Sequence, residues 1–489
     1  MTPGRPIRRL LVANRGEIAV RVIRACRAAY VEAVAVCSEA DARAKHVRLA
    51  DASVLIGPAP ARESYLDAAK LLDAARRTGC DAVHPGYGFL SENAAFARAV
   101  EAAGLVWVGP PPGAIEAMGL KIGSRERMRA AGVPVVPGTH DLSLDLGRSV
   151  GFPLVVKASA GGGGKGMRVV RSADGLAEAV ASCGREAEAA FGDGTLYAER
   201  YLERPRHVEV QVVGDRQGRV AALGERECSL QRRHQKVIEE SPSPAVSPEL
   251  RRRMCEAAVA AATAVGYVGA GTVEFLLAPD GNFFFLEMNT RLQVEHPVTE
   301  EAFGVDLVAL QLRVASGEPL PASLPTAPSW WAFEARLYAE DAEHGFLPQT
   351  GRLLVFEEPS GPGIRVDSGV AAGDEIGVHY DPMLAKIVAR GATREEARRR
   401  LASAVSETLV LGVTTNLSYL RRVLDSGPVV AGEMDTSLLE RLEIAPVPPP
   451  SAEAFEAARR EFSMKVPEAA GEGSHFPDPF AAGGFRMFR

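Results

Sequence analysis

The stretch GTVEFLLAPDGNFFFLEMNTRLQVE, residues 271–295, decides the fold that we predict for this chain. It contains two apolar runs on either side of Asp280-Gly281, a preferred two-residue turn between antiparallel strands. A hairpin centred on that turn places Glu274 directly opposite Glu287. The rest of the prediction works outward from this pair.

Two opposed glutamates need a compensating charge, because like charges directly across a ladder destabilise a sheet. A divalent cation supplies that charge. Mg²⁺ or Mn²⁺ suits carboxylates better than zinc does, because these ions prefer oxygen ligands and keep positions open for phosphate oxygens. A shifted register, or arginines that pair with Glu274 and Glu287, would explain the pattern without a metal.

If the second strand continues past residue 287, its alternation places a row of polar side chains on one face. The row consists of Glu287, Asn289, Arg291, Gln293 and Glu295. Arg291 could hold an anion with its fork of donors, and Glu295 could accept a proton from that anion. A solvated polar face is the alternative, and the alternation alone does not decide between the two.

A glycine-rich loop, KASAGGGGKGM at 157–167, lies between two apolar runs. Four consecutive glycines let backbone N–H groups approach a phosphate, and Lys157 and Lys165 add positive charge. The loop is not a Walker A motif, because Ser159 stands at the first glycine position and Gly166 follows the lysine. A flexible linker is the alternative, which the flanking strands disfavour.

A charged run, ERECSLQRRHQK at 225–236, follows the strand-like segment RHVEVQV at 206–212. Such runs usually form a solvated face. Its position between strand-rich stretches also admits an anion pocket.

Apolar runs and helical patterns alternate through the first 117 residues, which predicts a parallel sheet with helices on its faces. This part contains no G-x-G-x-x-G, so dinucleotide binding is not indicated. A Pro- and Ser-rich linker, 317–329, precedes a third unit of short strands and helices. The segment 445–489 begins with several prolines, and we interpret it as a linker or partner-docking tail.

The chain of 489 residues favours about three structural units, and its 46% hydrophobic and 24% charged residues are typical of globular proteins. A net charge of −6 does not favour nucleic-acid binding. The six cysteines show neither metal-ligand nor disulfide spacing, and the start shows no signal or membrane segment. We therefore expect a cytoplasmic protein without nucleic-acid or membrane partners.

Together these stretches resemble the biotin carboxylase family of the ATP-grasp fold. The similarity covers about 10–442, and its motifs occur in the family's order: ANRGEIA at 13–19, HPGYGFLSEN at 84–93, the glycine loop, 231–236 and EMNTRLQVEHP at 287–297.

The resemblance implies a fold of mixed α/β and α+β class. A Rossmann-like N-terminal domain would span 1–117. An ATP-grasp domain would span 118–330, with a glycine-rich lid at about 132–205. A mixed α/β C-terminal domain would span 331–444.

The resemblance also implies roles for individual residues. ATP would be bound by Lys121, Lys157, Gly163, Gly164, Met167, Glu199, Arg200, Leu202, His207, Gln231, His234 and Leu276. The metal ligands would be Glu274, Glu287 and Asn289. Bicarbonate would be bound by Lys236, Arg291, Gln293 and Val294. Glu295 would be the general base, and Arg336 would stabilise the biotin enolate.

These roles imply ATP-dependent carboxylation of biotin by bicarbonate through carboxyphosphate, with Mg²⁺ or Mn²⁺. Too few residues follow Lys465, in the only near match to a biotin attachment turn, to complete a carrier domain. We therefore expect biotin on a separate carrier protein, a carboxyltransferase partner, and a homodimer or larger assembly as in relatives. Residues 478–486 resemble the start of the connecting region in longer acyl-CoA carboxylase α subunits, of the acetyl- or propionyl-CoA type.

Two alternatives remain open. Another ATP-grasp ligase, of the carbamoyl phosphate synthetase or carboxylate–amine type, would share Glu274, Glu287 and Asn289 but not the combination of 293–296 with Arg336. A non-catalytic ATP-binding scaffold subunit would be expected to have lost a motif, and none is missing. The sequence does not identify the final acyl-CoA acceptor.

Overall fold

The computed structural model describes residues 6–140, 142, 149–159, 166–233 and 235–444, together with a few positions between 451 and 460. The expected lid is therefore described only in part. The interpretation of 445–489 as a docking tail lies almost wholly outside the described residues.

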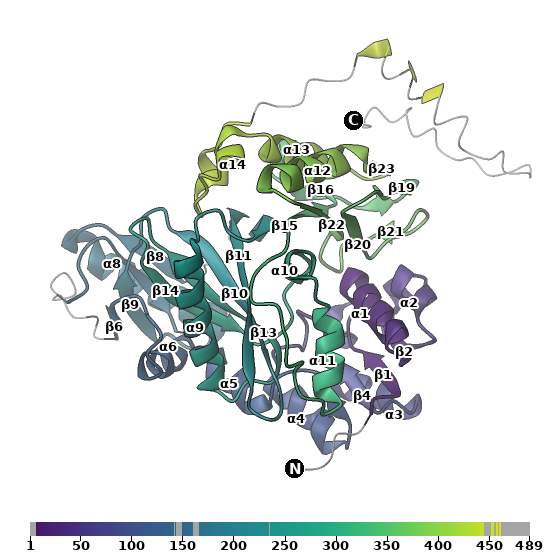
Figure 1. The fold of residues 1–489 in the computed structure, drawn as a ribbon, viewed down its shortest axis with the longest axis horizontal. Coiled ribbons are helices and arrows are strands. Elements are labelled where there is room, and N and C mark those ends of the chain that lie inside the picture. Colours follow the sequence, from purple (N-terminus) through teal and green to yellow (C-terminus); the bar gives the residue numbers. More distant parts are fainter. Residues whose placement is uncertain are drawn as a thin grey trace, which may run out of the picture.

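The N-terminal segment forms the expected parallel sheet with helices on its faces (Figure 1). Its strand order is β3-β2-β1-β4-β5, with β1 at Arg9–Val12, β2 at Glu32–Ser38, β3 at Ala52–Gly57, β4 at Ala82–His84 and β5 at Val106–Trp107. The helices are α1 (Gly16–Ala28), α2 (Lys45–Leu49), α3 (Ala68–Arg77), α4 (Ala94–Ala102) and α5 (Pro112–Gly119). The alternation in the sequence thus predicted this parallel sheet with helices on its faces.

A four-stranded antiparallel sheet of order β6-β9-β7-β8 follows, with α8 (Leu176–Phe191) packed against it. Its strands are β6 (Gly138–Thr139), β7 (Leu154–Ala158), β8 (Met167–Val170) and β9 (Leu196–Arg200), and α6 (Lys121–Ala130) leads into them. In Figure 1 this small sheet lies at the side of the molecule opposite the N-terminal segment. The glycine-rich loop joins β7 to β8.

An eight-stranded sheet of order β14-β13-β10-β11-β12-β15-β22-β20 runs through the centre of the molecule. It is formed by β10 (Arg206–Gly214), β11 (Val220–Arg232), β12 (Gln235–Ser241), β13 (Gly269–Leu277), β14 (Phe283–Asn289), β15 (Trp331–Tyr338), β20 (Ile364–Ser368) and β22 (Met383–Gly391). Because β12 pairs with β15, the sheet continues across residue 330, where we expected one domain to end. The linker 317–329 contains no helix or strand.

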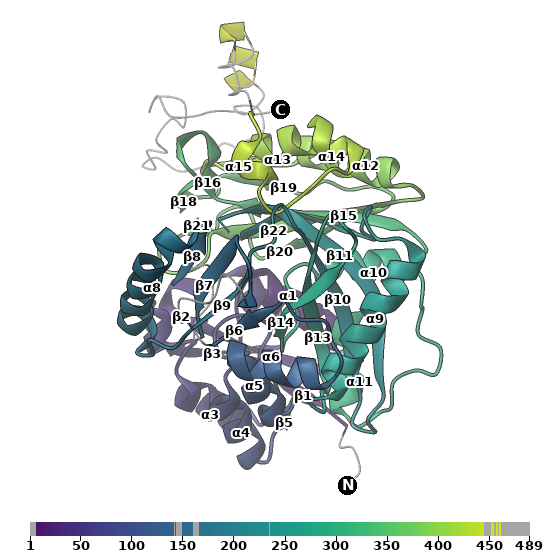
Figure 2. The ribbon, with the colours of Figure 1, turned by 90° about the vertical axis from the view of Figure 1, so that its left-hand side faces the viewer.

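Helices cover this sheet and link it to its neighbours (Figure 2). The middle segment contributes α9 (Pro248–Thr263), α10 (His296–Phe303) and α11 (Leu307–Ala315). The C-terminal segment adds α12 (Arg394–Glu407), α13 (Leu417–Leu424), α14 (Gly427–Ala431) and α15 (Leu438–Arg441), with short strands β16 (Glu340–Asp341), β17 (Leu347–Pro348), β18 (Gly351–Arg352), β19 (Val355–Glu357), β21 (Glu375–Ile376) and β23 (Leu409–Leu411). None of the helices in the described ranges has the length and apolarity needed to cross a membrane.

The hairpin of β13 and β14 pairs Glu274 with Glu287 as predicted, but its turn is different. Ala278 donates its N–H to the carbonyl of Asn282, so the loop has three residues and ends at Gly281, whose φ is +83°. That shifts the register by one residue near the turn. A bulge at Leu286 shifts it back before the glutamates, so the predicted pairing is right although the predicted two-residue turn is wrong.

A buried layer of charge joins the N-terminal segment to the central sheet. Arg21 of α1 contacts Glu300 of α10 at 2.8 Å, and Arg365 of β20 contacts the same carboxylate at 2.8 Å. Lys386 of β22 lies 3.1 Å from Glu17 of α1. Because each ion has an oppositely charged partner, these groups can be buried between elements that are far apart in the sequence.

His84, at the end of β4, is fully buried and joins that sheet to α11. Its Nδ1 accepts the N–H of Gly86 at 3.0 Å, so Nε2 carries the proton and donates to Gln311 Oε1 at 3.2 Å. Burial lowers the pKa of His84 from 6.5 to about 4. The folded protein therefore holds this imidazole in its neutral form.

We predict that His84 reduces stability on acidification between about pH 6.5 and 4, because the unfolded chain binds a proton that the folded chain does not. His84→Asn keeps an acceptor near Gly86 and does not titrate. The stability advantage of the parent over this variant should shrink by roughly 2 kcal/mol from pH 7 to pH 5, as measured by urea unfolding. An advantage that is equal at both pH values would contradict the prediction.

Candidate active site

A cavity of about 1210 Å³ lies where the N-terminal segment, the small sheet and the central sheet meet. It is lined by all the predicted site residues whose side chains the structure describes: Lys157, Met167, Glu199, Arg200, Leu202, His207, Gln231, Lys236, Glu274, Leu276, Glu287, Asn289, Arg291, Gln293, Val294, Glu295 and Arg336. Gly163, Gly164 and His234 lie outside the described residues, and the side chain of Lys121 is likewise not described. The structure thus brings into one cavity side chains that lie up to 179 residues apart, from Lys157 to Arg336.

One row of side chains crosses four neighbouring strands beneath this cavity. Glu287 of β14 faces Glu274 of β13, which faces Glu209 of β10, which faces Arg226 of β11. Three carboxylates in succession would destabilise the sheet without cations beside them. Arg226 and a lysine from the neighbouring strand β12 supply those cations.

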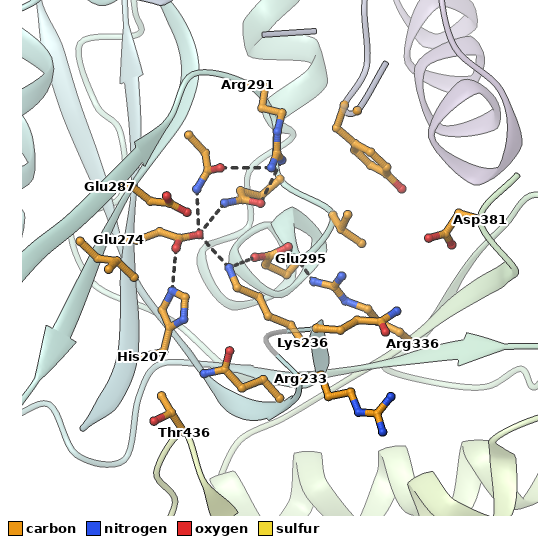
Figure 3. Close-up of a pocket in the computed structure, with 18 of the residues that line it drawn as sticks. His207, Arg233, Lys236, Glu274, Glu287, Arg291, Glu295, Arg336, Asp381 and Thr436 are labelled. Carbon is orange, nitrogen blue, oxygen red and sulfur yellow. Dashed lines mark hydrogen bonds and ion pairs between the residues drawn. The ribbon is translucent and has the colours of Figure 1, made fainter. Parts of the chain in front are cut away.

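That lysine is Lys236, which has only 11% of its side chain exposed. Its ammonium contacts Glu274 at 2.9 Å and Glu295 at 2.6 Å (Figure 3). It also contacts Glu209 at 2.6 Å. Burial alone would lower the pKa of Lys236, but the three carboxylates, led by Glu209, raise it well above its usual value. Lys236 is therefore a permanent positive charge in the cavity.

Glu274 accepts hydrogen bonds from Lys236 at 2.9 Å, Asn289 at 2.8 Å and Gln293 at 3.0 Å. Nε2 of His207 lies 2.9 Å from its other oxygen. Burial would raise the pKa of Glu274, but Lys236 and His207 lower it below its usual value. The carboxylate is ionised at neutral pH.

Glu295 lies between two cations. Its second oxygen accepts from Arg336 at 2.9 Å, and Arg336 also donates to the buried Glu239. Burial would raise the pKa of Glu295, but Lys236 and Arg336 lower it well below its usual value. Arg336, on β15, therefore joins the Glu295 carboxylate to the C-terminal part of the sheet.

Arg291 is held by partners on both sides. Its Nε donates to Glu92 of the N-terminal segment at 2.9 Å, and its Nη atoms donate to Asn289 at 3.1 Å and Gln293 at 3.0 Å. Strand β14 ends at Asn289, so the predicted extension of this strand through the whole row is wrong. The five polar residues from 287 to 295 nevertheless all line the cavity, because the irregular segment after β14 bends along its wall.

The small sheet supplies the other end of the cavity. Glu199 of β9 is buried and contacts both Lys157 of β7 and Arg125 of α6. Lys157 lines the cavity beside Met167, at the two ends of the glycine-rich loop. A lysine at this end of the cavity fits the phosphates of a nucleotide.

Several site residues escaped the sequence analysis: Arg125, Glu209, Arg226, Glu239 and Glu92. Arg226 is fully buried, and its guanidinium reaches Glu209 at 2.5 Å, Gln211 at 2.7 Å and Thr272 at 3.0 Å. The charged run 225–236 was the signal that could have identified Arg226. The run is compatible with a solvated face or an anion pocket, and the burial of Arg226 excludes the solvated face for this residue.

The residues fit a magnesium or manganese ion bound with phosphate. Glu287 and Glu274 bring ionisable oxygens to the cavity from opposed strands, and Asn289 follows with an amide oxygen. His207, Glu209 and Glu274 also approach one another closely enough to hold a metal ion. The ammonium of Lys236 contacts both of these glutamates, so this second group already surrounds a cation.

Comparison with known families divides the chain into three matches. Residues 6–115 match "Biotin carboxylase, N-terminal domain", residues 121–323 match "Carbamoyl-phosphate synthase L chain, ATP binding domain", and residues 334–441 match "Biotin carboxylase C-terminal domain". The chain is also 47% identical to the biotin carboxylase of Allochromatium vinosum, over 89% of this chain and 98% of that protein. The chain belongs to the biotin carboxylase family.

Two further relatives extend this comparison within the family. The mitochondrial methylcrotonoyl-CoA carboxylase subunit alpha of Dictyostelium discoideum is 48% identical over 99% of this chain and 71% of its own length. The chain spans 60–62% of the length of other such α subunits. The biotin carboxylase domain dimer of Hydrogenobacter thermophilus 2-oxoglutarate carboxylase, solved with MgADP, ADP and bicarbonate, has a TM-score of 0.84 and 42% identity over 89% of this chain and 98% of that chain.

Arg226 provides a test of the charge balance beneath this biotin carboxylase cavity. We predict that Arg226→Met lowers the free energy of unfolding by about 3–5 kcal/mol, because it leaves Glu209 buried with one cation fewer. The measurement is the shift in the denaturant midpoint at neutral pH.

Arg252→Met is the matched control, because Arg252 pairs with Glu249 and Glu256 on the exposed face of α9. It should cause a much smaller shift, since exposed ion pairs contribute little. Equal shifts for the two variants would contradict the prediction.

Proposed function

We propose that this chain catalyses the ATP-dependent carboxylation of biotin with bicarbonate. The observation that carries this proposal is the convergence of Lys236, Arg291, Glu295 and Arg336 in the cavity that Glu274 and Glu287 also line. The structure solved with MgADP and bicarbonate, to which the chain is similar, supports the same assignment.

The cations at the centre of the cavity suit a small anion. Arg291 offers a planar fork of donors and Lys236 a point charge, so the two can hold bicarbonate together. Gln293 and the backbone of Val294 line the same wall. At the other end, Lys157, Met167, Glu199, Arg200, Leu202, His207, Gln231 and Leu276 are assigned to ATP, with Lys121, Gly163, Gly164 and His234 proposed from the resemblance.

Glu295 is assigned as the base. Its lowered pKa makes it a poor proton acceptor as long as Lys236 and Arg336 both contact it. Bicarbonate bound to Lys236 competes with Glu295 for this ammonium, which weakens its hold on the carboxylate and raises the basicity of Glu295. Binding of bicarbonate thereby makes Glu295 a better acceptor for the bicarbonate proton.

The chemistry then runs in two stages. A bicarbonate oxygen attacks the γ-phosphorus of ATP, and the bond to ADP breaks, which yields carboxyphosphate. Carboxyphosphate releases carbon dioxide and phosphate. The phosphate takes the proton from the biotin ureido nitrogen, Arg336 stabilises the enolate oxygen, and the nitrogen bonds to carbon dioxide. A metal held by Glu274, Glu287 and Asn289 would offset negative charge on the phosphate oxygens.

A carrier-bound biotin, a separate carboxyltransferase and a homodimer or larger assembly complete the proposal. The names of the methylcrotonoyl-CoA carboxylase α subunits support an acyl-CoA carboxylase context, and the Hydrogenobacter domain dimer supports a homodimer. The domain limits at 117, 330 and 444 and a cytoplasmic location remain predictions.

Biotin-stimulated ATP cleavage tests the function. We predict that the purified chain with Mg²⁺ hydrolyses ATP only when bicarbonate is present, and that free biotin increases the rate. Stimulation by ammonia or an amine in place of biotin would instead favour another ATP-grasp ligase. No ATP cleavage under any of these conditions would favour a scaffold subunit.

A variant of Arg336 tests the biotin stage of the reaction separately from ATP binding. We predict that Arg336→Met lowers the biotin-stimulated rate by about 10²-fold or more, because the enolate loses its cation, while the KM for ATP stays within about twofold. Arg390→Met on the neighbouring strand β22 is the control, since Arg390 stacks on Trp330 outside the cavity. Equal losses in the two variants would show that Arg336 has no specific role.

A further inference from the structure

The segment between β14 and α10, residues 290–295, carries Arg291, Gln293 and Glu295 but forms neither helix nor strand. A sheet or a helix would fix the direction of its peptide groups through backbone hydrogen bonds. Here two backbone hydrogen bonds, from the N–H of His296 to Gln293 and from the N–H of Val298 to Glu295, are both 3.3 Å long. Shorter hydrogen bonds come from side chains of the helix and sheet that pack behind the segment.

His296, the first residue of α10, holds one of these peptides. Its Nδ1 lies 2.7 Å from the carbonyl oxygen of Gln293. A carbonyl oxygen only accepts, so Nδ1 carries the proton and donates. The imidazole is fully buried, and burial together with Lys386 and Arg21 lowers the pKa of His296 well below its usual value, so the ring stays neutral with this tautomer.

Lys386 holds the next peptide. Its ammonium, buried at the centre of the charged layer, donates to the carbonyl of Val294 at 2.9 Å and lies 3.1 Å from Glu17. Two consecutive carbonyls, of Gln293 and Val294, are thus fixed by buried side chains from two different elements.

A trans peptide directs its N–H opposite to its C=O. The peptide between Gln293 and Val294 is trans, so holding the Gln293 carbonyl on His296 also fixes the direction of the Val294 N–H. Among the described residues, none accepts a hydrogen bond from this N–H or from that of Glu295. Val294 lines the cavity beside Arg291, so its N–H is a donor available to a bound anion.

We propose that His296 and Lys386 are positioning residues. His296 holds the Gln293 carbonyl and thereby directs the Val294 N–H at bicarbonate, and Lys386 holds the Val294 carbonyl and thereby fixes the next peptide, whose N–H belongs to Glu295. The inference rests on the proposed function, because it assigns the anion to this wall of the cavity. Neither side chain touches the substrate, and both act through the backbone.

The test is a pair of variants of nearly equal shape, His296→Asn and His296→Leu. Asparagine places an N–H near the position of Nδ1, whereas leucine does not, and both leave the same space behind. We expect His296→Leu to raise the KM for bicarbonate about tenfold, the size of one lost hydrogen bond, with the KM for ATP within about twofold. His296→Asn should restore most of the affinity for bicarbonate.

The double variant Glu17→Gln with Lys386→Met is the second arm, since it removes the ammonium without leaving Glu17 as an unpaired buried charge. It should also raise the KM for bicarbonate more than the KM for ATP. Equal bicarbonate KM values for His296→Asn and His296→Leu, or parallel changes in both KM values, would overturn the positioning role. Absence of bicarbonate-dependent ATP cleavage in the parent chain would instead overturn the proposed function.

Discussion

The arrangement of this molecule depends on a balance of buried charge around one ammonium group. Lys236 contacts Glu209, Glu274 and Glu295, which come from β10, β13 and the turn before α10. Three carboxylates cannot be buried beside a single cation without further positive charge. Arg226 below and Arg336 to the side supply it, so the row of glutamates across the sheet is a stable arrangement.

The same balance of charge allows one cavity to contain both an acidic region and a cationic region. Glu274, Glu287 and Lys157 line this cavity together with Arg336, which lies on β15 and links it to the C-terminal strands. Between them, Lys236 and Arg291 provide the positive centre. A small anion in the middle would be in reach of both ends.

Much of this could be predicted from the sequence. Alternating patterns identified the parallel sheet, and the hairpin turn identified the opposed glutamates. The predicted pairing of Glu274 with Glu287 is confirmed because the register shift from the longer turn is cancelled by the opposite shift from the bulge at Leu286. Neither feature has a distinct signal in the sequence, because a bulge is set by how the strand packs rather than by the residue that it contains.

The site residues that the sequence did not reveal are those whose burial depends on tertiary structure. Glu209 alternates with valines on β10, and Arg226 lies between Glu225 and Glu227 on β11. Both patterns are equally compatible with exposure or burial. Their burial follows from the covering of that face by distant elements, as in the contacts of Arg226 with Thr272 and Thr299. The sequence predicted no role for His296 or Lys386 for a similar reason, since their side chains contact main-chain carbonyls, which no sequence pattern indicates.

The continuous eight-stranded sheet has a consequence for how such a chain can change over evolutionary time. A module that is joined to its neighbour only by a linker can be exchanged for another by recombination. Here β12 and β15 form a ladder across the linker, with Ile238 opposite Ala335 and Glu239 opposite Glu334. A foreign C-terminal segment would have to bring a strand of matching register and charge, so the two halves are expected to be inherited together.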